Sequence, residues 1–412
     1  MRTPDVPTPA WSPWRVVVGF GVVSLAADMV YEGARSITGP FLGSLGATAL
    51  VVGVVTGAGE AVALVLRLVS GPLADRSGRY WALTIVGYAM TALCVPLMAV
   101  APFLGGAGLV FACTLVLLER AGKAVRSPSK SALLASAAQA VGRGRGFAVH
   151  KALDQVGAFA GPLLIAAVVA LTSAVWAGLA VLAVPAMAAM VLLIWIRARV
   201  PDMTVYAETA AELSTPVPSH LETAGLPTRF RLFALASAAS TLGLMTFGLI
   251  SFHLVEADLV SAPGVPLIYA AAMAAGAVSA LGTGFAYDRW GPRILVLLPF
   301  LVAAVPLLSL ADRLWVAVSG VVVWGAAVGC QDSTVKALVA DLVPAPRLAT
   351  AYGVFAAFQG AAALAGGVVA GALYDDGTGD LVVVIAVTQV ASLLLTLVVT
   401  RKARTSSPST LT

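Results

Sequence analysis

Long apolar segments alternate with short polar ones along the whole chain. Twelve of these segments are long and apolar enough to cross a bilayer as helices, since about 30 Å of hydrocarbon takes roughly 20 helical residues. Membrane strands would instead alternate apolar and polar positions over about ten residues. The pattern therefore predicts an all-α membrane protein with twelve transmembrane helices. They begin near Arg15, Ala47, Tyr80, Gly106, Phe147, Ala174, Arg231, Val265, Arg293, Leu314, Thr350 and Leu381.

Composition agrees with a bilayer as the solvent. Of 412 residues, 59% are hydrophobic and 11% are charged, whereas a soluble domain carries roughly 25% charged residues. Cys94, Cys113 and Cys330 all fall inside predicted spans without the spacing of metal ligands, so we interpret them as buried apolar side chains. No metal and no cofactor is expected.

A polar, proline-containing segment divides the chain in the middle, and it is too short and irregular for a catalytic domain. The predicted organisation is two six-helix bundles with connecting and terminal segments. These are a cytoplasmic tail at 1–14, an N-terminal bundle at 15–199, a cytoplasmic linker at 200–229, a C-terminal bundle at 230–400 and a cytoplasmic tail at 401–412.

Basic residues fall almost entirely on one side of this twelve-span arrangement. The other side holds Arg313 together with acidic loops around Glu256 and Asp375. By the positive-inside rule, both termini of this multi-pass protein are expected in the cytoplasm, with the spans in the cell membrane. The pI near 9.3 then reflects topology and does not indicate nucleic-acid binding. No feature of the sequence demands a second subunit, so we expect a monomer.

A charged segment occurs twice, once in each half. Gly71-Pro72-Leu73-Ala74-Asp75-Arg76-Ser77-Gly78-Arg79-Tyr80 has a counterpart 213 residues later in Gly284-Phe285-Ala286-Tyr287-Asp288-Arg289-Trp290-Gly291-Pro292-Arg293. Such duplication is typical of transporters built from repeats. The segment resembles the loop between spans two and three of the major facilitator superfamily, although a lysine is common where Tyr80 stands.

This resemblance implies two pseudo-symmetric bundles around a central cavity and a cytoplasmic gate at the duplicated segments. In the superfamily pattern the loop aspartate, here Asp75, faces the N-terminal end of span eleven and a basic residue of span four. Glycines Gly71 and Gly78 are expected to permit a sharp reversal. The alternative is a charged turn that is needed only for membrane insertion. The expected gate residues are Gly71, Asp75, Arg76, Gly78, Arg79, Gly284, Asp288, Arg289 and Gly291.

Ionisable residues inside the spans mark a candidate site. Each costs roughly 2.5–3.5 kcal/mol to insert, so such residues usually face a cavity or a partner. A carboxyl group in a low-dielectric cavity has a raised pKa and a nearby arginine lowers it, which suits proton loading and release. Glu119–Lys123, Lys151–Asp154 and Asp332–Lys336 could instead be internal salt bridges. The candidates for proton coupling and the substrate cavity are Asp28, Glu32, Arg35, Glu60, Glu119, Arg120, Lys123, Asp154, Asp332 and Lys336.

Two further features bear on function. Gly157, Gly161 and Pro162 in span five resemble the glycine–proline segment of drug–proton antiporters, and Arg120 resembles the buried arginine of the superfamily's span-four motif. The resemblance implies a secondary active transporter that works by alternating access. We favour a proton-coupled exporter of small molecules, driven by the proton gradient.

Three alternatives stay open at this point. The basic stripe Lys123, Arg126 and Lys130 would suit an uptake symporter for an anionic small molecule. A membrane-embedded enzyme is disfavoured because neither a zinc-type histidine motif nor a nucleophile elbow occurs, and the Gly122-Lys123 pair lacks the frame of an ATP-binding loop. The last alternative is a non-transporting sensor or partner protein.

Overall fold

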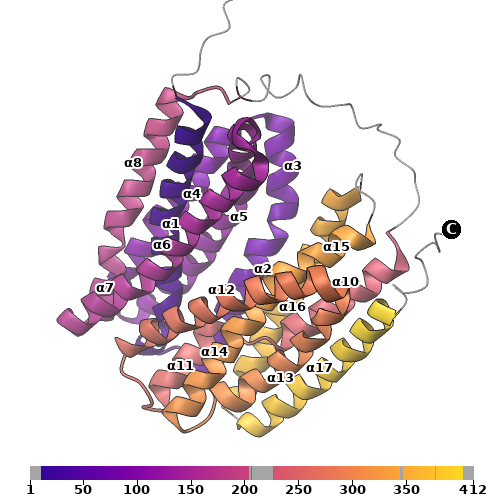
Figure 1. Cartoon of the computed structure of the whole chain (residues 1–412). Helices are drawn as coiled ribbons and strands as arrows, with labels where there is room; N and C mark the ends of the chain where they lie inside the picture. The colour runs from indigo at the N-terminus through magenta and orange to yellow at the C-terminus, as the bar shows by residue number, and fades with distance from the viewer. Residues whose placement is uncertain (1–10, 204–205, 207–225, 344–346, 376, 402–412) are drawn as a thin grey trace, which may run out of the picture. The chain divides into compact units, whose positions relative to one another are not determined.

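A computed structural model describes residues 11–203, 206, 226–343, 347–375 and 377–401 (Figure 1). All regular elements within these ranges are helical. Most of the predicted linker and almost all of both predicted tails lie outside the described residues. The predicted boundaries of these three segments therefore stay predictions.

The helices of the N-terminal half begin at α1 and end at α8. Their bounds are α1 Pro13–Ser44, α2 Ala49–Val65, α3 Arg67–Ser77, α4 Tyr80–Leu97, the 3₁₀ segment η1 Met98–Ala107, α5 Gly108–Val141, α6 Arg143–Thr172, α7 Val175–Val181 and α8 Ala183–Arg199.

The helices of the C-terminal half begin at α10 and end at α17. Their bounds are α10 Thr228–Gly243, α11 Phe247–Glu256, α12 Gly264–Trp290, η2 Gly291–Val296, α13 Leu297–Ser309, α14 Leu314–Cys330, the π-helical segment η3 Gln331–Val335, α15 Lys336–Leu342, α16 Leu348–Tyr374 and α17 Thr378–Arg401.

Ten helical stretches of the described chain are long and apolar enough to span a membrane, and two of these are long enough to cross it twice. Tyr80–Val141 has 62 residues and is interrupted in η1, where Gly105 takes a φ of 55°. Gly264–Ser309 has 46 residues and is interrupted at Gly291, whose φ is 68°. Since a single crossing takes roughly 20 residues, this division is consistent with twelve spans. Every predicted span begins within four residues of the first residue of an observed helical segment.

Several spans are divided into two helices along their length. Span two breaks at Leu66, between α2 and α3, and span seven breaks between Gly243 and Phe247. Span ten passes from α14 through the π-helical turn η3 into α15. Breaks of this kind leave backbone groups without their intrahelical partners, and the protein then satisfies some of them with side chains. At the break in span seven, Trp324 Nε1 donates to the Met245 carbonyl oxygen over 2.8 Å.

The chain forms two compact units. Among the described residues, the first unit takes in those of 11–34 and 66–206, and the second takes in those of 35–65 and 226–401. The end of α1 and all of α2 are thus packed with helices of the C-terminal half. Each unit has its own apolar core, with Phe20 stacked on Trp81 in the first and Phe233 on Phe355 in the second.

Small residues allow a close helix contact in the second unit, where α2 lies against α16. A Cβ atom added to Gly57 would lie 2.8 Å from the Ala363 carbonyl oxygen, and Gly53 meets the backbone at Gly367 and Gly371. Side chains at these positions would force the helices apart. Gly53 and Gly57 of span two therefore allow the close approach of a neighbouring helix.

Candidate functional site

Glycines of span five bring α6 against α1 within the first unit. A Cβ atom on Gly157 would lie 2.8 Å from Leu25 Cα, and one on Gly161 would lie 2.8 Å from Met29 Cα. No side chain fits at either position, so the two backbones approach as small-residue helix pairs do. The contact places Asp28 of α1 beside Asp154 of α6.

The two aspartates form a carboxyl pair. Their carboxyl groups lie within hydrogen-bonding reach of each other. An ionised carboxylate can only accept hydrogen bonds, so a hydrogen bond between them would require one of the two groups to carry a proton. The two residues, the Asp28–Asp154 pair, are therefore placed to share a single proton, as two carboxyl groups held close together generally do.

Cations and a hydroxyl group surround the Asp28–Asp154 pair. Ser24 Oγ donates to Asp154 Oδ1 over 2.8 Å, and Lys130 Nζ donates to the same serine oxygen over 3.1 Å. Lys151 Nζ lies 2.6 Å from Asp154 Oδ2, which forms the predicted Lys151–Asp154 salt bridge. The pair therefore lies beside two ammonium groups, those of Lys130 and Lys151.

A tyrosine on α1 faces two cations of α5. Arg120 donates from Nη1 to the hydroxyl oxygen of Tyr31, and its guanidinium carbon lies 4.5 Å from the centre of the tyrosine ring. The Nζ atom of Lys123 lies 3.3 Å from the same ring centre. Lys123 thus makes a cation–π contact and does not form the salt bridge with Glu119 that the sequence allowed.

Glu119 is held in the contact between α4 and α5. Its Oε2 lies 3.5 Å from Arg120 Nε, and its Oε1 accepts from the Thr91 hydroxyl over 3.3 Å. Arg126 in turn donates to Thr91 and lies over the ring of Tyr88, 4.8 Å from its centre. Glu119 and Arg126 are both buried. Glu119 is thus positioned as a counterion for two arginines, one directly and one through Thr91.

The other predicted site residues lie elsewhere. In the second unit, Arg35 Nη2 and Glu60 Oε1 form a salt bridge of 2.9 Å, with side chains 22% and 27% exposed. Asp332 is exposed in the π-helical turn, and the side chain of Lys336 is outside the described residues. Glu32 is half-buried on α1, one helical turn beyond Asp28. The predicted set is therefore divided between the two units.

The duplicated segments are mostly helical, which corrects the expectation that each forms a loop between two spans. Gly71 and Gly284 lie inside α3 and α12, so the expected reversal at Gly71 is wrong. The turns occur at Gly78 and Gly291, which have φ angles of 63° and 68°. These positive φ angles favour glycine because it has no Cβ atom.

The charged side chains of the duplicated segments are exposed, and each segment contains a tyrosine that donates to an aspartate. Tyr80 donates to Asp75 Oδ1 over 3.1 Å, and Tyr287 donates to Asp341 Oδ2 over 2.6 Å. The other exposed members are Arg76, Arg79, Asp288 and Arg289. The gate role of Asp75 stays a prediction.

Sequence reasoning missed three neutral members of the cluster, namely Ser24, Tyr31 and Thr91. Ser24 stands four residues before Asp28, and Tyr31 three residues after it, so both lie on the face of α1 that carries Asp28. That spacing was a usable signal. The place of Thr91 depends on how α4 packs against α5, which the sequence does not encode locally.

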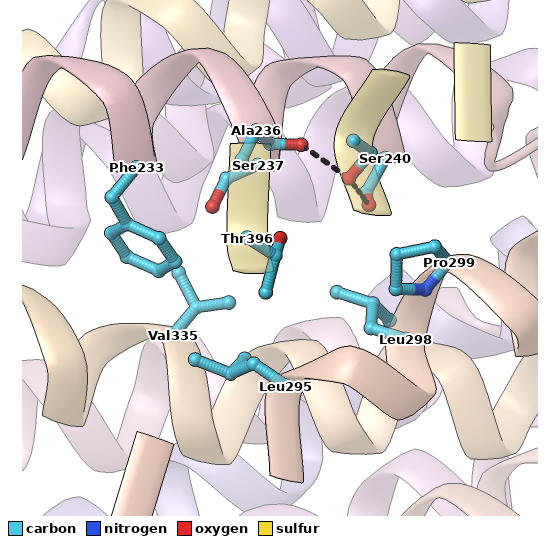
Figure 2. A pocket seen from close by; sticks show the side chains of 10 residues that line it. Phe233, Ala236, Ser237, Ser240, Leu295, Leu298, Pro299, Val335 and Thr396 are labelled. Carbon is cyan, nitrogen blue, oxygen red and sulfur yellow. Dashed lines mark hydrogen bonds between the residues drawn. The ribbon is translucent and has the colours of Figure 1, made fainter. Parts of the chain in front are cut away.

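The second unit contains a small, partly open pocket between α10, α13 and α17. Figure 2 shows Ser237 and Thr396 among its lining residues, facing the apolar side chains of Leu295 and Leu298. Ser392 donates to the Ala236 carbonyl oxygen over 2.8 Å. The free space for the centre of a water molecule is about 10 Å³, which suits a single water and not an organic substrate.

Comparison with known proteins places the chain in a family. The family model described as Major Facilitator Superfamily matches residues 20–281 and 233–411. The chain belongs to the Major Facilitator Superfamily. It is therefore a multi-pass membrane transporter of the secondary type and not a member of an enzyme family.

Relatives and solved structures agree with this membership. An uncharacterized protein of Mycobacterium tuberculosis, Rv2265, is 53% identical over 388 residues, which cover 94% of this chain and 93% of the relative. A mutant of the nucleoside transporter NupG superposes with a TM-score of 0.71 at 14% identity, covering 94% of this chain and 99% of that one.

A second structure, of a bacterial homologue of the human lysosomal transporter Spinster, gives a TM-score of 0.66 at 14% identity. The match covers 97% of this chain and 100% of that one. At this identity both structures show the fold, which is the major facilitator fold predicted from the duplicated segments.

Proposed function

We propose that this protein is a proton-coupled exporter that exchanges protons for a small molecule by alternating access. The observation that carries the proposal is the Asp28–Asp154 pair. Two carboxyl groups within hydrogen-bonding reach bind one proton together, and any rearrangement that parts them changes their affinity for it.

The position of the pair supports coupling to movement. Asp28 and Asp154 belong to different helices, and their contact depends on the glycine packing of α1 on α6. A shift between these helices would leave two carboxylates without their shared proton, each beside the cations of α5 and α6. Proton release and helix movement are thereby linked, as alternating access requires.

The same arrangement accounts for exchange. A cationic substrate group that binds at the pair takes the electrostatic place of the shared proton, so the two compete. Competition of a proton and a substrate for one site is the simplest basis for antiport. The energy source would be the proton gradient, with no bound cofactor. The segment Gly157, Gly161 and Pro162, similar to that of drug–proton antiporters, supports this choice.

We further propose that the spans lie in the cell membrane and that both chain termini face the cytoplasm. The support is the asymmetry of charge, with basic residues gathered on the side of the termini and Arg313 facing acidic loops on the other. The expected functional form is a monomer, because the cluster around the Asp28–Asp154 pair is built from α1, α5 and α6 of one chain.

One observation favours a second candidate, an uptake symporter for an anionic molecule. Arg120 and Lys123 both lie against Tyr31, which holds two cations together inside the first unit. An anionic substrate near these groups would bind together with a proton at the Asp28–Asp154 pair, and the two would be carried in the same direction.

The direction of driven flux separates the two candidates. Purified protein in liposomes should be tested with a panel of cationic dyes, such as ethidium, and of small carboxylates, under pH gradients of either sign. An exporter of the proposed kind accumulates a cationic compound in vesicles that are acidic inside. Accumulation of a carboxylate in vesicles that are acidic outside would favour the symporter. Downhill flux that no pH gradient alters would contradict proton coupling.

A further inference from the structure

A buried histidine stands beside the Asp28–Asp154 pair without a hydrogen-bond partner of its own. His150 lies near the start of α6 and is 7% exposed. Its Nε2 atom is buried and makes no hydrogen bond. A buried polar atom left in this way costs on the order of 1–3 kcal/mol, which calls for a functional reason.

The spacing of α6 aims this histidine at the pair. His150 and Asp154 are four residues apart on one helix, and residues so spaced are neighbours with Cβ atoms about 5–6 Å apart. Lys151, which bonds Asp154, has a side chain that is 66% exposed. This end of α6 therefore runs from solvent to the half-buried carboxyl groups within about one helical turn.

We propose that His150 is a proton relay between solvent at the Arg145 end of α6 and the Asp28–Asp154 pair. The proposal rests on the proposed function of the pair as the proton site and adds the route by which protons reach it.

The chemical step needs no further reactant. A ring nitrogen of neutral His150 takes a proton from hydronium and leaves water. The imidazolium then donates the hydrogen of its other ring nitrogen to a carboxylate oxygen of the pair, directly or through one water, and becomes neutral again. Release runs in reverse, and the two ring nitrogens exchange donor and acceptor roles.

The charged groups that face His150 suit a residue that transfers a proton and does not retain it. They are Lys130 from α5 and Lys151 and Asp154 from α6. The two ammonium groups repel a positive charge on the ring, while the carboxylate attracts it. A proton on His150 is therefore passed on toward Asp154.

The chain supplies a matched control in its second unit. His253 is also buried in a membrane helix, and its Nε2 atom is likewise without a hydrogen-bond partner, while its Nδ1 atom lies 2.8 Å from the Tyr374 hydroxyl oxygen. It differs from His150 in its place, because it belongs to α11, whereas the carboxyl pair is formed by α1 and α6. Replacement of His253 should leave proton movement at the pair unchanged.

Time-resolved infrared spectroscopy after a pH jump tests the relay without a transported substrate. The full chain in lipid nanodiscs is followed by the C=O stretch of its protonated carboxyl groups, and the band of the pair is identified by its loss in Asp28→Asn. His150→Ala should slow the response of this band by about tenfold or more, as loss of a proton-transfer group does. The pH midpoint of the band should stay near that of the unmodified protein. Millimolar imidazole should restore the rate in His150→Ala.

Each other outcome overturns the relay in a distinct way. An unchanged rate in His150→Ala would show that protons reach the pair by another route. A slowed rate that imidazole does not restore, or an equal slowing in His253→Ala, would show that the ring is structural. If no band depends on Asp28 in the unmodified protein, the proposed proton site itself fails and the relay fails with it.

Discussion

The carboxyl groups inside the predicted spans have different surroundings, and we expect different roles for them on that basis. Asp28 faces a second carboxyl group, whereas Glu119 faces Arg120, and Glu60 faces Arg35. Only the first arrangement needs a proton to be stable. The glutamates form salt bridges with their arginines, which makes them suited to holding helices together.

This contrast gives a prediction for Glu119. Replacing it with glutamine leaves the neighbouring Arg120 and Arg126 in a buried site without their counterion, which should destabilise the protein by about 1–3 kcal/mol. Thermal unfolding in detergent measures this loss. The pH dependence of transport should be retained, and a variant that is fully stable but no longer responds to pH would contradict the structural role.

Glu60 gives a milder version of the same prediction. Its salt bridge with Arg35 is partly exposed, so Glu60→Gln should cost about 1 kcal/mol. Coupling to pH should persist, because the pair lies outside the Asp28–Asp154 cluster. Thermal unfolding and pH-gradient-driven flux are the two measurements. A loss of driven flux at unchanged stability would return Glu60 to the coupling set that the sequence indicated.

At the residue scale, the sequence predicted the candidate site residues better than it predicted the contacts between them. Asp28, Asp154, Arg120 and Lys123 were all candidates because ionisable groups are costly in hydrocarbon. Their grouping could not be predicted, since Lys123 prefers the ring of Tyr31 to the nearby Glu119. That choice depends on the rotation of α5 against α1, and a helical repeat alone does not fix it.

At the element scale, apolar length fixes where helices begin, and glycine spacing fixes which helices touch. The observed helical segments begin within four residues of the predicted positions because the bilayer sets a minimum length for each span. Breaks inside spans were not predicted. The interruptions near Leu66 and Leu244 occur in apolar sequence without proline, where tertiary contacts replace the lost helical bonds.

The packing of α6 on α1 can be tested at one glycine. Gly161→Ala would place a methyl group 2.8 Å from Met29 Cα, so α1 must move away from α6. We expect a destabilisation of about 1–3 kcal/mol, together with loss of the infrared band of the Asp28–Asp154 pair. Thermal unfolding and the infrared spectrum measure the two effects.

Gly282→Ala is the matched control for this substitution. Gly282 is also inside a membrane helix, but a Cβ atom added there meets no atom within 4 Å. The control should be neutral or slightly stabilising, because alanine favours a helix by up to about 1 kcal/mol. If Gly161→Ala behaves like Gly282→Ala, close packing of α1 and α6 is not what holds the carboxyl pair together.

At the scale of the whole molecule, duplication was the signal that indicated the family. The two charged segments share Asp-Arg and a following glycine, and Gly78 and Gly291 both turn the chain with positive φ angles. The family match over residues 20–281 and 233–411 confirms the interpretation. What could not be predicted is that Arg35–Val65 forms a compact unit with the C-terminal helices, because long-range packing decides it.

The gate predicted at the first charged segment can be separated from membrane insertion. Asp75→Ala should reduce transport about two- to fivefold while the protein still reaches the membrane in normal amount, since an anion at a helix N-terminus is worth about 0.3–1 kcal/mol. Tyr80→Phe removes only the hydroxyl that donates to Asp75 and should have a smaller effect. Normal flux in Asp75→Ala would exclude the gate, and equal losses in both variants would assign the effect to the local hydrogen bond.

The central claim is that proton binding at the Asp28–Asp154 pair drives transport, and one comparison in liposomes tests it most directly. The rate of substrate counterflow, which needs no net proton movement, is measured beside pH-gradient-driven accumulation for the unmodified protein, Asp28→Asn and Asp154→Asn. We predict that both variants keep counterflow within a few-fold of the unmodified protein and lose driven accumulation. Driven accumulation that survives in both variants would contradict the account.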